Sequence, residues 1–223
     1  MIALSVAVAA YLTALAGLIF ISGNRRLFCY YTAAKAAVSG GFLAVALLAF
    51  AVGGRRLGGR FWLLFAAMAL CAAGDVLLGL ANNGRGIHSK TFLRGLYCFG
   101  GAHLVFCIFY AVLRLPSWWD LLLPLALTGT TMLLSKKGLL RLHRLRAPAF
   151  GYSFLVGLMC SMAVGALSAG GPPLAAAGSV LFLLSDCIIV FLYFYIRQRP
   201  WMRIANLTTY YLGLLLLGLA AAA

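Results

Sequence analysis

Long apolar runs separated by short polar connections repeat along the whole sequence. Each run approaches the ~20 residues that a helix needs to cross the hydrocarbon core of a bilayer. The connections carry Gly, Pro, Asn or Arg, as in GGRRLGGR at 53–60. The four tryptophans fall at the ends of runs, where amphipathic rings prefer the membrane interface. The pattern predicts eight transmembrane helices, over residues 2–21, 29–52, 61–81, 92–113, 118–134, 149–169, 174–196 and 204–222.

Composition points the same way and excludes most soluble classes. Of the 223 residues, 65% are hydrophobic and only 9% are charged, which leaves too few polar side chains to cover a water-soluble fold. We therefore predict an all-α polytopic membrane protein, a bundle of eight helices in which residues 1–223 form a single integral membrane domain. No basic residue precedes the first run, so we expect it to be a retained helix rather than a secretory signal.

Basic residues lie in the connections and give the chain a net charge of +15. Short clusters of this kind suit phospholipid headgroups better than DNA or RNA, so we expect a lipid bilayer and no nucleic acid as partner. With eight helices, 13 basic residues fall on one side and 4 on the other, and Lys35 lies within a helix. The positive-inside rule then places the richer side in the cytoplasm and both termini outside. The basic connection at 135–146 is predicted as either a short interfacial helix or a solvated loop.

Four ionisable residues fall inside the predicted helices: Lys35, Asp75, His103 and Asp186. Such residues are costly in lipid and usually face the interior of a bundle. Counted along the helix at about 1.5 Å per residue, Lys35 and Asp75 lie roughly 9 Å from the cytoplasmic ends of their helices, and the other two roughly 15–17 Å. The shared depth predicts a polar cleft open to the cytoplasmic leaflet, although buried ion pairs that only hold the bundle together would give the same pattern. Further polar residues at similar depth could line the cleft: Tyr30, Tyr31, Asn82, Asn83, Ser185, Tyr193, Tyr210 and Tyr211.

The two intramembrane aspartates are 111 residues apart, which is half of the chain. Each follows a small residue, in GDVLL (74–78) and SDCII (185–189). This spacing predicts two tandem four-helix halves in parallel orientation, an arrangement known among membrane proteins. Asp120 follows two tryptophans at the start of a helix and is expected to be an interfacial residue without chemistry.

Cysteine and glutamate usage narrows the chemistry. The six cysteines lie in or beside apolar runs and form no CxxC pair, and buried cysteine behaves as a small hydrophobe, so we expect no disulfide. The chain has no glutamate, which excludes an HExxH metalloprotease site. It also has no GxSxG motif of the kind found in serine hydrolases. Two i,i+4 pairs leave a metal site open as an alternative, although we expect no metal and no cofactor. These pairs are Cys71 with Asp75 and His103 with Cys107.

Five stretches carry a resemblance to a known family, in this order: KAAVSGGFLAVALL (35–48), GDVLL (74–78), FLRGLYCFGGAHLVFCIFY (92–110), GSVLFLLSDCIIVF (178–191) and YYLGLLLLGLA (210–220). They resemble the lysine-led second helix, the Gly-Asp motif, the Gly-His helix, the Ser-Asp helix and the last helix of the YhhN family of lysoplasmalogenases. That family comprises eight-helix membrane proteins that hydrolyse the vinyl ether bond of lysoplasmalogens. The family usually has a proline, a glycine and a glutamine at three positions where this chain differs. Here Ala36 replaces the proline, Ala102 replaces the glycine, and no glutamine follows Tyr211. These departures bear on substrate preference more than on reaction type.

The resemblance implies cofactor-independent hydrolysis of alkenyl-glycerophosphocholine or alkenyl-glycerophosphoethanolamine to a fatty aldehyde and the glycerophospho-headgroup. It implies Asp75 and Asp186 as catalytic residues, supported by Lys35 and His103. Vinyl ethers are labile to acid, and two carboxyls could divide into a proton donor and an anion, as in glycosidases. The remaining candidates for supporting or substrate-binding residues are Ser185, Tyr31, Asn82 and Tyr210, with Arg26, Arg94 and Arg199 to hold the phosphate of a lysophospholipid.

The two aspartates differ in expected protonation. Asp186 is deeper and has no basic neighbour on its own helix, so we expect it to be the protonated acid, because burial disfavours a charged carboxylate. Asp75, at the depth of Lys35, would be the ionised base or cation stabiliser; the reverse assignment stays open. A membrane transporter or proton-coupled carrier is the main alternative function, since paired halves and intramembrane charges suit it equally. A metal enzyme and a structural role are further alternatives.

Overall fold

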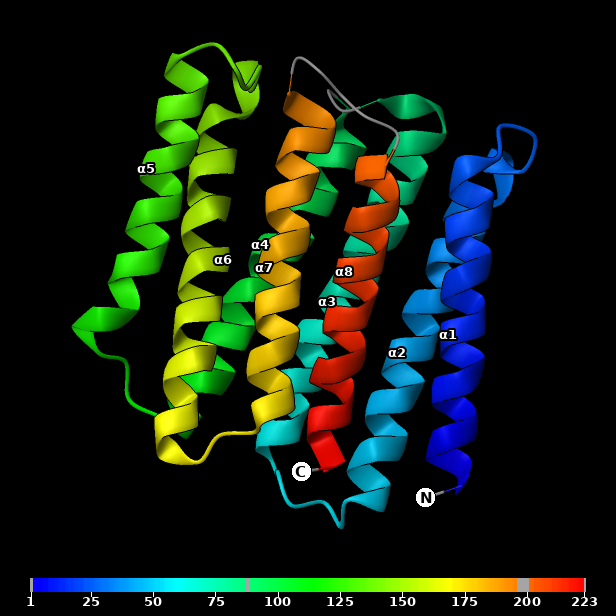
Figure 1. Cartoon of the computed structure of the whole chain (residues 1–223), viewed down its shortest axis with the longest axis vertical. Helices are drawn as coiled ribbons and strands as arrows, with labels where there is room; N and C mark the ends of the chain where they lie inside the picture. The colour runs from blue at the N-terminus through cyan, green and yellow to red at the C-terminus, as the bar shows by residue number, and fades with distance from the viewer. Residues whose placement is uncertain (1, 87–88, 196–200, 223) are drawn as a thin grey trace.

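The architecture is a bundle of eight α-helices in a computed structural model that describes residues 2–86, 89–195 and 201–222 (Figure 1). All eight predicted helices are present within a few residues of the expected bounds, and the described residues form no β-sheet. The prediction of an all-α polytopic fold is therefore confirmed. The helices are α1 (Ile2–Gly23), α2 (Tyr31–Val52), α3 (Arg60–Leu80), α4 (Lys90–Leu113), α5 (Leu122–Lys136), α6 (Arg146–Ala166), α7 (Pro173–Phe194) and α8 (Trp201–Leu219).

Seven of these helices are long and apolar enough to cross a membrane by length and composition. The exception among the described helices is α5, which has 15 residues and follows the 3-10 turn Trp118–Leu121. At about 1.5 Å per residue α5 alone is about 22 Å long, which is less than the ~30 Å of a hydrocarbon core. The chain is an integral membrane protein in which α5 is the shortest of the described helices.

Both termini lie at the same end of the bundle, as an even number of spans requires (Figure 1). We call this the terminal end, and the opposite end the basic end. The connections α1–α2, α3–α4 and α5–α6 lie at the basic end and carry most of the arginines and lysines, whereas Arg55, Arg56, Arg60 and Arg114 lie at the terminal end. The predicted division of charge is therefore present among the described residues. Arg197 and Arg199 lie outside them.

Contacts between helices repeat from one half of the chain to the other. Consecutive helices pack within each half, from α1 to α4 and from α5 to α8. Between the halves, α4 packs on α6 and α8 packs on α2. The fourth helix of each half thus contacts the second helix of the other, which supports the predicted arrangement of tandem halves.

Glycines allow two close approaches that shape the centre of the bundle. A Cβ atom on Gly178 of α7 would lie 2.6 Å from the carbonyl oxygen of Gly213 on α8, so the two backbones can meet only because both residues lack side chains. A Cβ atom on Gly74 of α3 would lie 2.7 Å from the ring of Phe99 on α4. These small residues bring α7 against α8 and α3 against α4, and Gly74 directly precedes Asp75.

The connection at 135–146 is neither an interfacial helix nor a loosely solvated loop. Its leucines at 140, 142 and 145 are buried, while the basic residues between them are exposed. Between the end of α5 and the start of α6, only the 3-10 turn His143–Leu145 is helical. The backbone N–H of Arg141 donates to the carbonyl oxygen of Phe194 at 2.9 Å. The leucine–base alternation therefore lays the connection over the basic end of α7.

Asp120 lies at the terminal end, where it ties α4 to α5. It is buried, and both of its carboxylate oxygens accept hydrogen bonds from Arg114, at 2.5 and 2.7 Å. The backbone N–H of Ser117 also donates to it, at 2.7 Å. Its expected position at the start of a helix is confirmed, and the structure adds a buried ion pair with Arg114 that the sequence analysis did not predict.

Candidate functional site

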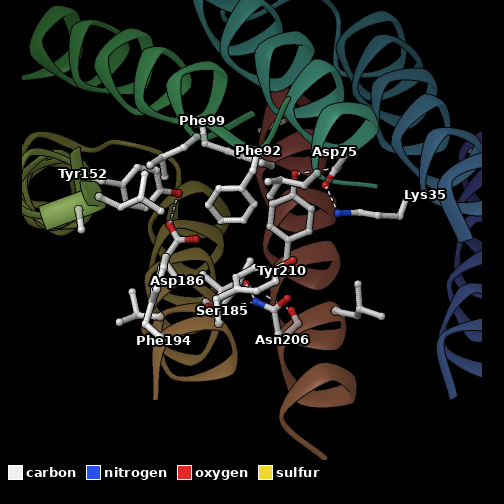
Figure 2. Close-up of a pocket in the computed structure, with 18 residues that line it drawn as sticks. Lys35, Asp75, Phe92, Phe99, Tyr152, Ser185, Asp186, Phe194, Asn206 and Tyr210 are labelled. Carbon is white, nitrogen blue, oxygen red and sulfur yellow. Dashed lines mark hydrogen bonds and ion pairs between the residues drawn. The ribbon is translucent and has the colours of Figure 1, made fainter. Parts of the chain in front are cut away.

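A cavity of about 60 Å³ lies among α2, α3, α4, α6, α7 and α8, in the half of the bundle nearer the basic end. This volume is enough for a few water molecules. Asp75 and Asp186 both line it, and most of the rest of the wall is apolar, including Phe92 and Phe99. Figure 2 shows the Lys35–Asp75 pair on one side of the cavity and the Tyr152–Asp186 pair on the other. Two carboxyl groups from separate helices thus face one largely dry space, which we call the aspartate cavity.

Asp75 is fully buried, and its carboxylate contacts three donor groups. The ammonium nitrogen of Lys35 lies 2.8 Å from its Oδ1. The hydroxyls of Ser39 and Tyr210 donate to its Oδ2, at 2.7 and 2.9 Å. Lys35 and Ser39 are four residues apart on α2, so one face of that helix presents both donors. Charge-assisted bonds of this kind favour an ionised carboxylate.

Asp186 has a different set of partners. Its Oδ2 lies 3.0 Å from the hydroxyl of Tyr152 on α6 and 3.2 Å from Nε2 of His103 on α4. The same hydroxyl lies 3.0 Å from Nε2 of His103, so the three groups form a closed triangle. Within the described chain, His103 is the only basic side chain that forms an ion pair with Asp186. The charge state of this carboxyl group therefore depends on an imidazole rather than on a permanent cation.

The other ring nitrogen of His103 fixes the tautomer. Nδ1 lies 3.2 Å from the sulfur of Met159. A thioether can only accept a hydrogen bond, so we assign the hydrogen to Nδ1. A neutral ring then presents the lone pair of Nε2, which can accept a hydrogen bond from a protonated Asp186 or from the Tyr152 hydroxyl. With Asp186 protonated, or with an imidazolium facing its carboxylate, the Asp186–His103 pair holds one transferable proton at the wall of the cavity.

Ser185 and Asn206 join α7 to α8 beside Asp186, and both line the cavity. The amide nitrogen of Asn206 donates to the hydroxyl of Ser185 at 2.8 Å and to its carbonyl oxygen at 2.9 Å. The Ser185 hydroxyl donates in return to the carbonyl oxygen of Asn206 at 3.3 Å. These bonds engage the amide nitrogen of Asn206 and the hydroxyl of Ser185, and they hold this part of the wall in place.

Two other predicted residues lie just outside the cavity. Tyr31 is buried at the start of α2, and its ring centre lies 6.0 Å from the ammonium of Lys35, within the range of a cation–π contact. Asn82 lies in a π-helical turn after α3 and exchanges hydrogen bonds with the hydroxyl of Tyr193, at 2.9 and 3.2 Å. Tyr193 lines the cavity. Both residues therefore reach the site through a neighbour.

Most of the predicted site residues lie together in the structure, and four further residues belong to the site. Lys35, Asp75, Ser185, Asp186 and Tyr210 surround the cavity, and His103 lies directly behind Asp186. Arg26 and Arg94 are exposed at the basic end and do not line the cavity; Arg199 lies outside the described residues. The residues that the sequence analysis missed are Ser39, Tyr152, Met159 and Asn206.

The i,i+4 pairs that left a metal site open do not form a ligand set. The two ring nitrogens of His103 contact Met159 and the Asp186–Tyr152 pair instead of Cys107. Over the described ranges, no group of three or more His, Cys, Asp and Glu side chains is arranged to hold a metal ion.

Comparison with known proteins gives one match. The sequence model of the YhhN family matches residues 35–221, a region that begins at Lys35 and contains every residue that lines the aspartate cavity. No curated protein and no solved structure matches the chain. Because the match covers most of the sequence, the chain belongs to the YhhN family.

Proposed function

We propose that this protein hydrolyses the vinyl ether bond of lysoplasmalogens, releasing a fatty aldehyde and the glycerophospho-headgroup. The observation that carries the proposal is the pair of buried carboxyl groups on one cavity, one beside a lysine and the other beside a histidine and a tyrosine. Membership of the YhhN family supports it, since that family is associated with lysoplasmalogenase-like function.

The reaction needs a proton delivered to carbon. Protonation of the β-carbon of the vinyl ether gives an oxocarbenium ion, to which water adds, and the resulting hemiacetal collapses to an aldehyde and an alcohol. One water molecule is consumed for each bond broken. The site must therefore offer an acid, an anion to stabilise the cation and a base for the incoming water, as glycosidases do with their paired carboxyls.

The Asp186–His103 pair is suited to supply the proton. Transfer to the substrate leaves a carboxylate and a neutral imidazole, and the Tyr152 hydroxyl, 3.0 Å from Oδ2, can donate to the new anion. That carboxylate would lie beside the oxocarbenium ion, where low dielectric strengthens the attraction. When water adds, its proton returns to the pair and the acid is restored.

Asp75 is suited to a charged role throughout the cycle. Its three donors satisfy the carboxylate without protonating it. Across a cavity with room for water, such an anion can orient the water molecule and oppose the positive charge of the intermediate. Lys35 holds this carboxylate in place and balances its charge when no substrate is bound.

The direct experiment is to incubate the purified protein with 1-alkenyl and 1-acyl lysophospholipids and to measure free aldehyde. We expect aldehyde from the alkenyl lipid and no hydrolysis of the acyl lipid. Failure to release aldehyde would overturn the proposal, and uptake of a solute into proteoliposomes without lipid turnover would favour a transporter instead.

We also propose that the basic end faces the cytoplasm, because positively charged connections are retained on that side. The aspartate cavity would then open toward the cytoplasmic leaflet. A reporter fused to the C-terminus, active only outside the cytoplasm, should be active; an inactive reporter with a correctly inserted protein would reverse this orientation.

A further inference from the structure

A second cavity, of about 100 Å³, lies between α5, α6 and α7. It shares Tyr152, Asp186 and Val190 with the aspartate cavity, so Asp186 belongs to the wall between the two. We call this second space the lateral cavity. Its position means that the proposed proton donor can be reached from two directions.

The lateral cavity exists because α5 is a peripheral helix. α5 packs on α6, whereas the main neighbours of α7 are α6 and α8. Leucines on the outer face of α5 are exposed, with Leu125 and Leu133 each at 59%. In a bilayer this face meets lipid, and the space between α5 and α7 lies at the edge of the bundle.

Most of the lining of the lateral cavity is hydrocarbon surface. Leu127, Val156, Leu183 and Phe191 contribute hydrocarbon surface. The hydroxyls present are already bonded within the protein: Thr131 donates to the carbonyl oxygen of Leu127, and Ser153 to that of Ala149, both at 2.9 Å. Such a wall suits a hydrocarbon chain and offers little to a charged headgroup.

The aspartate cavity also has a mostly apolar wall, but it is the one of the two that Lys35 and Asp75 line. It lies toward the basic end, where exposed arginines and lysines can attract a phosphate. A single-chain lipid with its headgroup on that side would need an exit for its chain. Because Asp186 lines both cavities, a chain that passes from one to the other carries its first carbons past the carboxyl group.

We propose that the lateral cavity binds the first carbons of the substrate's alkenyl chain and that the rest of the chain extends between α5 and α7 into the bilayer. The fatty aldehyde leaves by the same route, while the headgroup leaves toward the basic end. The identity of the chain as an alkenyl group rests on the proposed function; the binding of a lysolipid chain at this place does not.

The test uses a lysophospholipid with a non-hydrolysable 1-alkyl chain that carries a diazirine a few carbons beyond the ether oxygen, in the part of the chain that the proposal places in the lateral cavity. Photolysis in vesicles followed by peptide mass spectrometry maps where the chain lies. We expect adducts on α5 and α7, at or beside Leu127 and Leu183, which an excess of unlabelled 1-alkyl lysophospholipid removes. Adducts at Leu78 or Phe99, which line only the aspartate cavity, would overturn the proposal.

Matched pairs of tryptophan variants test whether the labelling depends on the lateral cavity. Leu183→Trp fills the lateral cavity, whereas Leu184→Trp places the same ring on the exposed outer face of α7. We expect roughly tenfold less labelling for Leu183→Trp and no change for Leu184→Trp, since a hydrophobic pocket discriminates on this scale. Leu127→Trp, compared with Leu125→Trp, repeats the comparison on peripheral α5 in case the change on α7 prevents folding. Equal labelling within both pairs would refute the chain site.

The outcomes separate this inference from the proposed function. Wild-type protein that is labelled in the lateral cavity but releases no aldehyde would refute the function and leave the chain site standing. Protein that releases aldehyde but is labelled elsewhere would refute the chain site alone.

Discussion

The two aspartates occupy equivalent places in the two halves of the bundle. Asp75 lies on the third helix of the first half and takes its partners from α2 and α8. Asp186 lies on the third helix of the second half and takes its partners from α6 and α4. Each carboxyl group is therefore held by the second helix of its own half and the fourth helix of the other.

The partners differ although the positions correspond. The second helix brings an ammonium to Asp75, at 2.8 Å, and a phenol to Asp186, at 3.0 Å. The fourth helix brings a phenol to Asp75 and an imidazole to Asp186. A repeated fold thus builds two carboxyl sites, and in the proposed mechanism the nature of the neighbouring side chain decides which one releases a proton. Breaking each site in turn should give different results.

Asp186→Asn should have the largest effect on turnover. Loss of a general acid costs roughly 10²- to 10⁴-fold in rate, and the amide cannot transfer a proton to carbon. Aldehyde release measures this, with monodispersity in detergent as the check on folding. A well-folded variant that kept more than about a tenth of wild-type activity, given that expected range, would remove Asp186 from the role of acid.

Lys35→Met should have its main effect on stability. It leaves Asp75 as a buried carboxylate without its cation, which costs about 3–5 kcal/mol. The double variant Lys35→Met/Asp75→Asn removes both charges and should recover much of that loss, while remaining inactive. Thermal unfolding in detergent tests this, and a double variant no more stable than the single would show that the ion pair is not the cause.

Tyr152→Phe should reduce turnover by roughly tenfold, since a hydrogen bond to a charged group is worth about 1.5–3 kcal/mol. The variant keeps the ring and removes only the hydroxyl that faces Asp186. Tyr110→Phe is the matched control, because that hydroxyl is buried against Ser179 and is remote from both carboxyl groups. Equal losses in the two variants would point to a general effect of removing a buried phenol.

Met159→Leu should have the smallest effect, a fall of a few-fold in turnover, a factor typical of the loss of one weak hydrogen bond. Without the sulfur, the hydrogen of His103 is free to move to Nε2, where it donates to Asp186 and favours the carboxylate over the acid, so that the proton of Asp186 is lost to solvent in more of the molecules. Nitrogen NMR of labelled histidine reports the tautomer directly. An unchanged tautomer in a variant with lowered turnover would show that packing, and not proton placement, explains the loss.

The helices and the paired aspartates could be predicted from sequence because both can be recognised without knowing which helices are neighbours. Apolar length defines a span, and Asp75 and Asp186 stand out in apolar surroundings. Ser39 also carries a local signal, since it follows Lys35 by one turn on the same helix face. Tyr152, Asn206 and Met159 were missed because their importance depends on which helices are neighbours, and hydropathy does not encode that. The inward-facing leucines of the 135–146 connection were missed for the same reason.

Protonation of carbon leaves a mark in the product, and this gives the most direct test. Turnover of a 1-alkenyl lysophospholipid in D₂O, with immediate borohydride reduction of the aldehyde, should yield a fatty alcohol with one solvent deuterium at carbon 2. Asp186→Asn should yield none of this product. An aldehyde without that deuterium, or unchanged lipid after incubation with folded wild-type protein, would contradict the account.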